Sequence, residues 1–282
     1  MDKIKHWASL FLVFLALAPL LGTAQDMHVA TYNIRLLTPK DSGNLWNDRK
    51  EALCQLIQYH EFDIFGVQEA FDTQIQDMLT AMPMYQYIGV GRDDGHKKGE
   101  HSAIFYNPSR FELVRSGTFW LSDKDTQKPN KGWDAALPRI CTWGIFKDRQ
   151  NNRAFIFMNT HFDHKGKVAQ VESARLILDK ARELAGELPI ILTGDFNVDE
   201  NSRAYLTFAQ NSLIKDTHEV AETVYEPNST FNGWGQHIKP KSRIDHILVS
   251  PSFKVKKYGI LTDTYRGKYP SDHFPVTSVI QW

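Results

Sequence analysis

The sequence predicts an α/β fold in which two packed β-sheets carry helices on their outer faces. About a dozen apolar segments of strand length lie in two β-rich halves of the 282-residue chain, with several amphipathic segments of helix length between them. Some runs, such as "IILTG" at 190–194, show no polar alternation, which is expected of strands covered on both faces. Helices outside two stacked sheets provide that cover.

The first half alternates between strands and helices. Strands are predicted over 28–34, 63–70 and 85–92, and helices over 46–60, entered through Asn47 or Asp48, and over 72–82. Segments 101–107 and 111–122 are predicted to form a strand pair that turns at Pro108 and Ser109. The turn sequence "RQNN" at 149–152 predicts a hairpin between strands 139–148 and 154–162.

The second half repeats this rhythm. A helix is predicted over 167–185, where Val168, Val171, Leu178 and Ala181 form an apolar stripe that ends before Gly186. Strands are predicted over 188–198, 243–250, 254–263 and 274–282. No internal repeat or linker divides residues 25–282, so we expect a single domain.

Composition is that of a globular protein, with 42% apolar and 23% charged residues. The 33 basic and 33 acidic side chains balance, so the surface has no overall electrostatic footprint for nucleic acid, and any polyanion would have to bind in a local cleft. The two cysteines, Cys54 and Cys141, are too few for a disulfide framework, and either a disulfide or two buried thiols is consistent with them.

Residues 1–24 are typical of a signal peptide. Lys3 and Lys5 precede an uncharged apolar run that ends in small residues at Gly22 and Ala24, and the run is short for a membrane-spanning helix. We therefore expect cleavage near Ala24 and export to the periplasm or the extracellular space; an uncleaved N-terminal anchor is the alternative.

Polar residues of the types found in active sites recur at the ends of predicted strands. Seven groups share this position: Asn33, Gln68–Glu69, Glu100, Asn159–His164, Asp195 with Asn197, Asp245–His246, and Asp272–His273. One such group means little, but seven predict that side chains from several strands converge on one edge of the sandwich. Because His246 alternates with Asp245 along its strand, it is expected to face away from the site.

The segment "NTHFDH" at 159–164 also has the appearance of a zinc site. Its second half matches the H-x-H-x-D-H pattern of metallo-β-lactamase-type hydrolases, but Asn159 stands where that pattern has its first histidine. A key ligand is therefore missing. Along a strand, Asn159, His161 and Asp163 share one face, which favours a role for His161 in a site shared with other strands.

Taken together, the motifs resemble those of the endonuclease/exonuclease/phosphatase superfamily. "TYNIR", "VQEA", "GEHSAIFYN", "NTHFDH", "TGDFN", "RIDHILV" and "SDHFPV" occur in the order of that superfamily and cover residues 27–282. The resemblance implies a four-layer α/β/β/α sandwich and metal-dependent hydrolysis of a phosphoester. In-line attack by water requires a base, positive charge on the phosphoryl oxygens and assistance to the leaving oxygen.

The resemblance assigns the catalytic pair and the metal site. His273 is the expected base, oriented by Asp245, because an imidazole paired with a carboxylate is suited to proton transfer near neutral pH. Glu69 is the expected metal ligand, with Asn33 and Asp272 as further direct or water-mediated ligands. Such oxygen-rich ligand sets favour Mg²⁺ or Mn²⁺.

Other residues are expected to handle the phosphoryl group, the leaving group and the substrate. Asp195 and Asn197 would align the attacking water and the phosphoryl group, and His161 with Glu100 forms a second imidazole–carboxylate pair that could donate a proton. Arg139 is a candidate phosphate clamp. The expected lining of the substrate site consists of Asn159, His164 and Trp133, with Asp163 and His164 also suited to hydrogen bonding at a strand end.

The substrate class is left open by the sequence. Two departures argue against abasic-site repair: Arg35 stands where that branch has an aspartate, and His161 lies near the position of a tyrosine. A phosphodiesterase or nuclease is the preferred reading; the alternatives are a phosphomonoesterase on sugar or inositol phosphates and a phospholipid-headgroup hydrolase. A catalytically silent sandwich that binds glycans is the non-enzyme alternative. No stable protein partner is implied.

Overall fold

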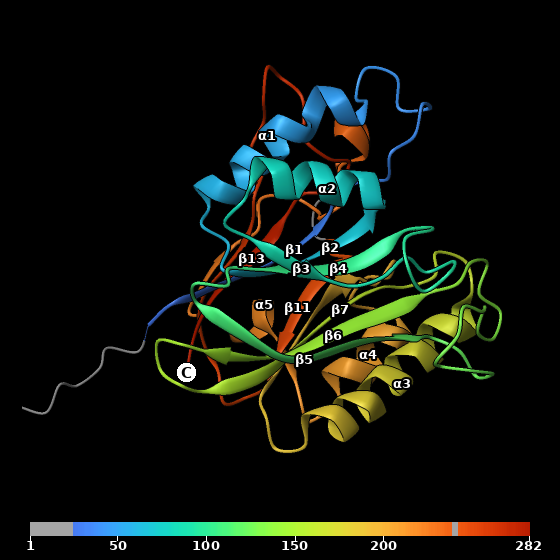
Figure 1. The fold of residues 1–282 in the computed structure, drawn as a ribbon, viewed down its shortest axis with the longest axis vertical. Coiled ribbons are helices and arrows are strands. Elements are labelled where there is room, and N and C mark those ends of the chain that lie inside the picture. The colour runs from blue at the N-terminus through green and yellow to red at the C-terminus, as the bar shows by residue number, and fades with distance from the viewer. Residues whose placement is uncertain (1–24, 239–241) are drawn as a thin grey trace, which may run out of the picture.

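The computed structural model describes residues 25–238 and 242–282, and the predicted signal segment 1–24 lies outside them. Two mixed sheets stack face to face (Figure 1). Helices α1 (Trp46–Tyr59) and α2 (Asp72–Ala81) lie over one outer face, and α3 (Lys167–Ala185) and α4 (Arg203–Ala209) lie over the other. The predicted four-layer α/β/β/α sandwich is therefore confirmed. None of the helices in the described ranges combines the length and apolar character needed to cross a membrane.

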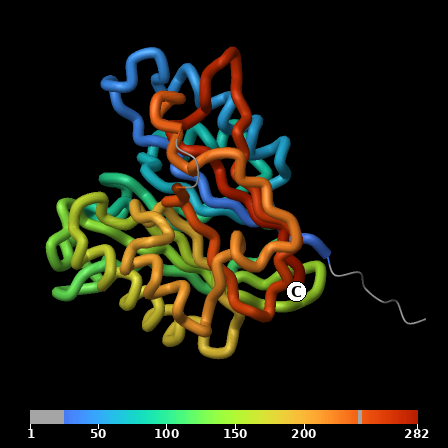
Figure 2. Tube along the Cα trace, turned by 180° about the vertical axis from the view of Figure 1, so that it is seen from behind, coloured from blue at the N-terminus to red at the C-terminus, as the bar shows by residue number. Residues whose placement is uncertain are grey.

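The first sheet combines strands from both ends of the chain. Its order is β10 (Thr223–Tyr225), β12 (Lys254–Ile260), β13 (Val276–Gln281), β1 (Met27–Asn33), β2 (Ile64–Ala70), β4 (His101–Tyr106) and β3 (Gln86–Ile88). The C-terminal strand β13 pairs antiparallel with β1, and Figure 2 shows the two side by side. The predicted strand over 85–92 is shorter than expected, because only three residues pair with β4 at the edge of the sheet.

The second sheet comes from the middle of the chain. Its order is β5 (Phe111–Trp120), β6 (Ile140–Asp148), β7 (Ala154–His161), β8 (Ile190–Asp195), β11 (Asp245–Val249) and β9 (Lys215–Asp216). The predicted hairpin between β6 and β7 is confirmed. A short helix α5 (Thr217–Val220) and a 3₁₀ turn η1 (Gly233–Gly235) complete the elements, and neither was predicted.

One predicted strand pairing is wrong. Strands β4 and β5 do not pair with each other, because β4 lies between β2 and β3 in the first sheet while β5 pairs with β6 in the second. The turn at Pro108 and Ser109 carries the chain from one sheet to the other. All six residues of β4 are buried, so its apolar pattern does not indicate which sheet it joins.

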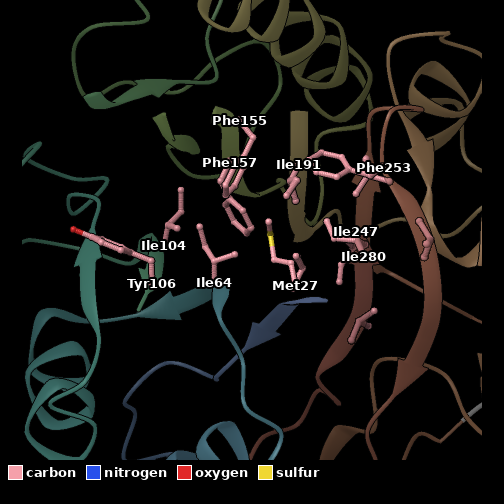
Figure 3. Close-up of a cluster of buried hydrophobic side chains, with 14 of the residues drawn as sticks. Met27, Ile64, Ile104, Tyr106, Phe155, Phe157, Ile191, Ile247, Phe253 and Ile280 are labelled. Atoms are coloured by element: carbon pink, nitrogen blue, oxygen red, sulfur yellow. The ribbon is translucent and has the colours of Figure 1, made fainter. Parts of the chain in front are cut away.

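The space between the sheets is filled by large apolar side chains from both sides. Phe157 and Ile191 of the second sheet face Ile64 and Ile104 of the first, as Figure 3 shows. Separate apolar clusters fill the layers under α1 and α2 and under α3 and α4. Cys54 lies in the former and Cys141 in the latter, and both are unpaired buried thiols.

Strand direction brings the polar strand ends to one edge of the sandwich. Strands β1 and β2 run parallel, as do β7 and β8, so the carboxyl ends of each pair lie together. Strand β11 runs antiparallel to β8, which places its first residue, Asp245, opposite Asp195 at the end of β8. The predicted convergence therefore follows from the register of these strands.

Candidate active site

Glu69 is aimed into the site by a β-bulge at the end of β2. The pairing of β2 with β4 shifts between Val67 and Ala70, so Gln68 and Glu69 lie opposite the single residue Ser102. Glu69 has a φ of 63°, a left-handed conformation that non-glycine residues rarely adopt. Its carboxylate accepts hydrogen bonds from the backbone N–H of Leu36 at 3.0 Å and from Asn33 at 3.1 Å. Bulges of this kind commonly redirect a side chain beside an active site.

Asn33 joins the carboxylates of the two sheets. Its side-chain Nδ2 donates to Glu69 Oε1 and, at 2.9 Å, to Asp195 Oδ2 on the opposite sheet. Its Oδ1 accepts the backbone N–H of Arg35 at 3.0 Å, and its backbone oxygen accepts the hydroxyl of Ser271 at 2.7 Å. Asn33 is fully buried, so this geometry is rigid.

Asp272 and Glu69 flank the guanidinium of Arg35. Arg35 Nη1 lies 3.9 Å from Glu69 Oε2 and 3.7 Å from Asp272 Oδ2, while Nε and Nη2 bind Asp41 at 2.8 and 2.9 Å. Burial and the nearby charge of Glu69 raise the pKa of Asp272. Two converging carboxylates in a buried position are electrostatically complementary to a cation.

His273 and Asp245 form the predicted imidazole–carboxylate pair. His273 Nδ1 lies 2.9 Å from Asp245 Oδ2, and Nε2 is 3.9 Å from Asp195 Oδ2, so Nε2 points to the cleft. Burial disfavours the charged imidazole, but the carboxylates, Asp245 first, raise the pKa of His273 to about 10. The ring edge of Phe231 packs against the imidazole, with centroids 5.0 Å apart.

Glu100 is shared between His161 and an arginine that the sequence analysis did not identify. Glu100 accepts two hydrogen bonds from Arg92, at 2.7 and 2.8 Å, and its Oε2 lies 3.6 Å from His161 Nδ1. Burial would raise the pKa of Glu100, but the neighbouring His161 and Arg92 lower it to about 2. The carboxylate is thus anionic and held mainly by Arg92.

The hydrogen bonds of Asn197 define the proton position on His161. Asn197 Nδ2 donates to the carbonyl oxygen of Phe162 at 2.9 Å, which identifies that atom as the amide nitrogen, and it lies 2.9 Å from His161 Nε2. His161 Nε2 must therefore accept, and its proton lies on Nδ1, facing Glu100. In this arrangement His161 holds Asn197, whereas the sequence suggested a proton donor.

Arg139 lies beside His161, with part of its guanidinium unpaired. Its Nε is 3.4 Å from Asp163 Oδ2, and its Nη2 is 3.2 Å from Nδ1 of the exposed His164. Partial burial and the charge of Arg139 lower the pKa of His164, which favours the neutral imidazole. Asp163 also accepts the backbone N–H groups of Lys165 and Gly166 before α3, consistent with the predicted hydrogen-bonding role.

Three buried nitrogens around Arg139 lack hydrogen-bond partners among the residues that the structure describes. They are Arg139 Nη1, Arg92 Nε and His161 Nδ1, and their side chains line one small polar cavity with Glu100. Unsatisfied buried donors are costly, and they commonly mark a place where a ligand or water supplies the acceptor. A phosphate oxygen is a suitable acceptor, but the cavity as it stands has no room for a water-sized molecule, so these side chains would have to shift to admit one.

Asn159 does not line the cleft, although the sequence suggested that it binds substrate. It is fully buried between the sheets, where its Nδ2 donates at 2.9 Å to the carbonyl oxygens of both Val67 and Ala103. Its Oδ1 accepts from Gln68 at 2.7 Å and from Thr193 at 3.0 Å. Asn159 therefore ties the two sheets together directly behind the bulge that carries Glu69.

Trp120 at the end of β5 and Trp133 in the loop that follows both pack into the protein. Trp133 is half-buried against the apolar cluster under the second sheet, and Trp120 donates its indole N–H to the backbone oxygen of Arg92 at 2.9 Å. The predicted substrate contact of Trp133 is not evident in this packing. His246 is buried beside Asp216, 3.4 Å away, and faces away from the site as expected.

The ligand set fits a divalent ion. Glu69 and Asp272 bring carboxylate oxygens to one side of the site. Asn33 presents its amide nitrogen there and its Oδ1 binds the backbone N–H of Arg35, so in this geometry it orients Glu69 and offers no free oxygen. Asp195, Asp245 and His273 also offer ligand atoms within 4.8 Å of one another, but the imidazole and Asp245 already bind each other there. Carboxylate oxygens suit a hard cation such as Mg²⁺ or Mn²⁺.

A helix-covered double sheet with this edge site defines a metal-dependent phosphoester hydrolase. The chain belongs to the Endonuclease/Exonuclease/phosphatase family, whose model matches residues 30–273. A mannosyl-6-phosphatase of Bacteroides thetaiotaomicron is 50% identical, with 91% of this chain and 100% of that chain covered and a TM-score of 0.89. Another family protein from Bacteroides thetaiotaomicron is 49% identical over 91% of this chain and 98% of that chain, also with a TM-score of 0.89. Nocturnin of Xenopus laevis is 26% identical over 81% of this chain and 63% of its own length.

Two arginines that position the site were missed in the sequence. Arg92 binds Glu100, and the buried Arg49 donates to the backbone oxygens of Ile34, Arg35 and Pro270, joining the segments that carry Asn33 and Asp272. Arg49 lies in a predicted helix whose apolar pattern gives no sign of a buried charge. Only the structure shows that Arg49 is fully buried.

Proposed function

We propose that this protein is an exported, metal-dependent phosphomonoesterase that removes phosphate from a sugar 6-phosphate of the mannose type. The observation that carries the proposal is the 50% identity with a mannosyl-6-phosphatase over essentially the whole of both chains. The motifs alone favoured a phosphodiester substrate. Because of this identity we now prefer a sugar phosphomonoester, which was one of the alternative substrate classes. The predicted signal segment 1–24 supports the export part of the proposal.

The buried donors around Arg139 support a phosphate group at this site. Arg139 Nη1 and Arg92 Nε have no hydrogen-bond partner among the described residues, although Arg92 Nε lies 3.9 Å from Asp93 Oδ1, and both belong to guanidinium groups that suit phosphate oxygens. The near-neutral composition offers no extended basic track for a polymer backbone. A small phosphate ester needs only local positive charge.

In the proposed mechanism, Asp245 holds the proton on Nδ1 of His273 and leaves Nε2 to accept a proton from the attacking water. A new P–O bond forms as the bond to the sugar oxygen breaks, and the departing sugar oxygen takes up a proton from solvent. The products are inorganic phosphate and the free sugar hydroxyl. Asp195 and Asn197 orient the water and the phosphoryl group from the end of β8. A divalent ion held by Glu69 and Asp272, with Asn33 orienting Glu69, would supply positive charge to the phosphoryl oxygens. It would also offset the carboxylate charge that raises the pKa of His273, so that Nε2 is free to accept the proton.

The test is a Mg²⁺- and Mn²⁺-dependent comparison of mannose 6-phosphate, bis-p-nitrophenyl phosphate and single-stranded DNA. We expect turnover of the monoester and at least a 100-fold loss in a folded His273→Ala variant, since general-base catalysis contributes about 10²–10⁴. Hydrolysis of the diester or of DNA in preference to the sugar phosphate would overturn the substrate assignment.

The metal assignment has its own measurement. Glu69→Gln keeps the side-chain volume and removes one charge, so we expect weaker Mn²⁺ binding by calorimetry with little change in thermal stability. Glu112→Gln, at an exposed position on β5, is the matched control. Equal Mn²⁺ affinity in Glu69→Gln and the unsubstituted protein would exclude Glu69 as a ligand.

A further inference from the structure

A second polar pocket of about 520 Å³ opens between the outer edges of the two sheets. It is formed by the end of β3, the C-terminal half of β5 and the loops over 89–96 and 127–129. The groups that face it include Asp94, Ser116, Thr118, Trp120 and Gln127. None of these belongs to the phosphate site, so the pocket is a separate feature.

Trp120 connects this pocket to the catalytic residues. Its indole N–H binds the backbone oxygen of Arg92, whose guanidinium binds Glu100, and Glu100 lies 3.6 Å from His161. The pocket and the catalytic edge are therefore separated by one indole ring and one ion pair. A substrate that extends past the phosphorylated group could reach both.

The chemistry of the lining identifies the class of ligand. Neither lysine nor arginine is among the twelve residues that line the pocket, all of which lie in the described ranges; the lining has one imidazole, His96, and one carboxylate, Asp94, so a strongly charged ligand is disfavoured. The side chains of Ser116, Thr118 and Gln127 offer both hydrogen-bond donors and acceptors. Trp120 is 4% exposed and adds only a small apolar surface. This combination matches a neutral ligand with many hydroxyl groups.

Backbone geometry keeps the pocket open and fixed. Gly95 has a φ of 72°, and a Cβ atom there would lie 3.3 Å from the ring of Trp120, so a side chain at this position would be strained and crowded. The Asp94 carboxylate accepts the backbone N–H groups of His96 and Lys98 at 2.8 and 2.9 Å, which orders the loop. A preformed pocket of this kind loses little entropy when a ligand binds.

We propose that this pocket is an accessory subsite for a neutral sugar residue of the glycan that carries the phosphorylated sugar. The inference rests on the proposed sugar-phosphatase function for the identity of the substrate, while the pocket itself is argued from its lining. It implies that an oligosaccharide phosphate binds more tightly than the corresponding monosaccharide phosphate. It also implies that an unphosphorylated oligosaccharide binds without occupying the catalytic site.

The test uses full-length protein and an unphosphorylated mannotetraose as the probe. Ser116→Trp fills the pocket from an exposed position on β5, and Gln127→Ala removes an exposed amide. Ser252→Trp, at an exposed turn away from this pocket, is the matched control. We expect calorimetry to show binding by the unsubstituted protein and Ser252→Trp, with affinity at least tenfold weaker in Ser116→Trp and reduced in Gln127→Ala.

Kinetics separate this inference from the proposed function. In the same variants, KM for mannose 6-phosphate should stay within twofold, while KM for a phosphorylated mannotetraose should rise at least fivefold in Ser116→Trp. Equal mannotetraose binding in Ser116→Trp and the unsubstituted protein, or no binding by either, would overturn the subsite. Failure to hydrolyse mannose 6-phosphate would overturn the proposed function and leave the binding result to decide the subsite on its own.

Discussion

Asn159→Leu should destabilise the protein and weaken its metal site together. The substitution keeps a similar volume but removes both hydrogen bonds to the carbonyl oxygens of Val67 and Ala103. Val67 and Ala103 are the last registered pair of β2 and β4 before the bulge, so the bonds from Asn159 add to the strand pairing there. Leucine cannot replace these donors, so each oxygen would lose the hydrogen bond that ties it to the opposite sheet.

The size of the effect follows from those two oxygens. A buried hydrogen bond contributes about 0.5–1.5 kcal/mol, so losing two costs about 1–3 kcal/mol. Gln68 and Thr193 lose an acceptor as well, but each keeps a second one, the hydroxyl of Thr31 and the backbone oxygen of Met158 respectively. Against a typical total stability of about 5–15 kcal/mol, the variant should still fold.

The metal site should change because Glu69 needs external support. A left-handed conformation at a non-glycine residue costs about 1–2 kcal/mol, and the bulge that imposes it is braced by Asn159. We expect the urea midpoint to fall by about 0.5–1 M and the Mn²⁺ affinity to fall at least tenfold.

Thr160→Val is the matched control for this experiment. Thr160 is the buried neighbour on β7, and its hydroxyl donates to Ile140 within the same sheet, away from the bulge. This variant should lose about 1 kcal/mol and keep its Mn²⁺ affinity. An unchanged urea midpoint in Asn159→Leu, or a lowered midpoint with unchanged Mn²⁺ affinity, would refute the coupling between the inter-sheet contact and Glu69.

Three further substitutions test other contacts. Asp163→Asn should cost about 1–3 kcal/mol at pH 7, because Arg139 loses a buried acceptor. Burial would raise the pKa of Asp163, but hydrogen bonds from backbone N–H groups and the charge of Arg139 outweigh it and lower this pKa. The stabilisation by the Asp163 carboxylate is therefore complete above its unfolded pKa of about 4 and is lost as the pH falls through its folded pKa. Urea titrations should therefore show the gap between the two proteins closing in acid, and a constant gap from pH 7 to 3 would contradict this. Gly66→Ala would place a Cβ atom 2.3 Å from Asn159 Oδ1, so thermal melting should show a loss of many degrees, and a melting temperature within two degrees of the original would disprove the close contact of the sheets. Arg49→Met should lower the free energy of unfolding by several kcal/mol in urea titrations, since four backbone oxygens lose their donor. An unchanged midpoint would show that water replaces the guanidinium.

The fold could be predicted from sequence where a pattern has one physical meaning. The helix α3 and the turn between β6 and β7 are confirmed. Of the stripe predicted for α3, Leu178 and Ala181 are buried, but Val168 at its start is exposed. The partners of β4 could not be predicted in the same way, because a strand buried on both faces has no polar side to indicate its sheet. Pairings between distant segments, such as β13 with β1, also leave no mark within either strand.

The residue types of the site could be predicted from the sequence, but not which of them reach the cleft and which are buried between the sheets. Asn159 and His161 do share one face of β7, as the strand periodicity predicts, yet they are two residues apart along it, a distance of about 6.6 Å. That distance separates the cleft, which His161 reaches, from the interior, where Asn159 contacts the opposite sheet. The same inner face therefore holds catalytic chemistry at its end and a structural polar contact one step deeper. Because Asn159 braces the bulge of Glu69, the interior of the sandwich and the geometry of its edge site depend on the same hydrogen bonds.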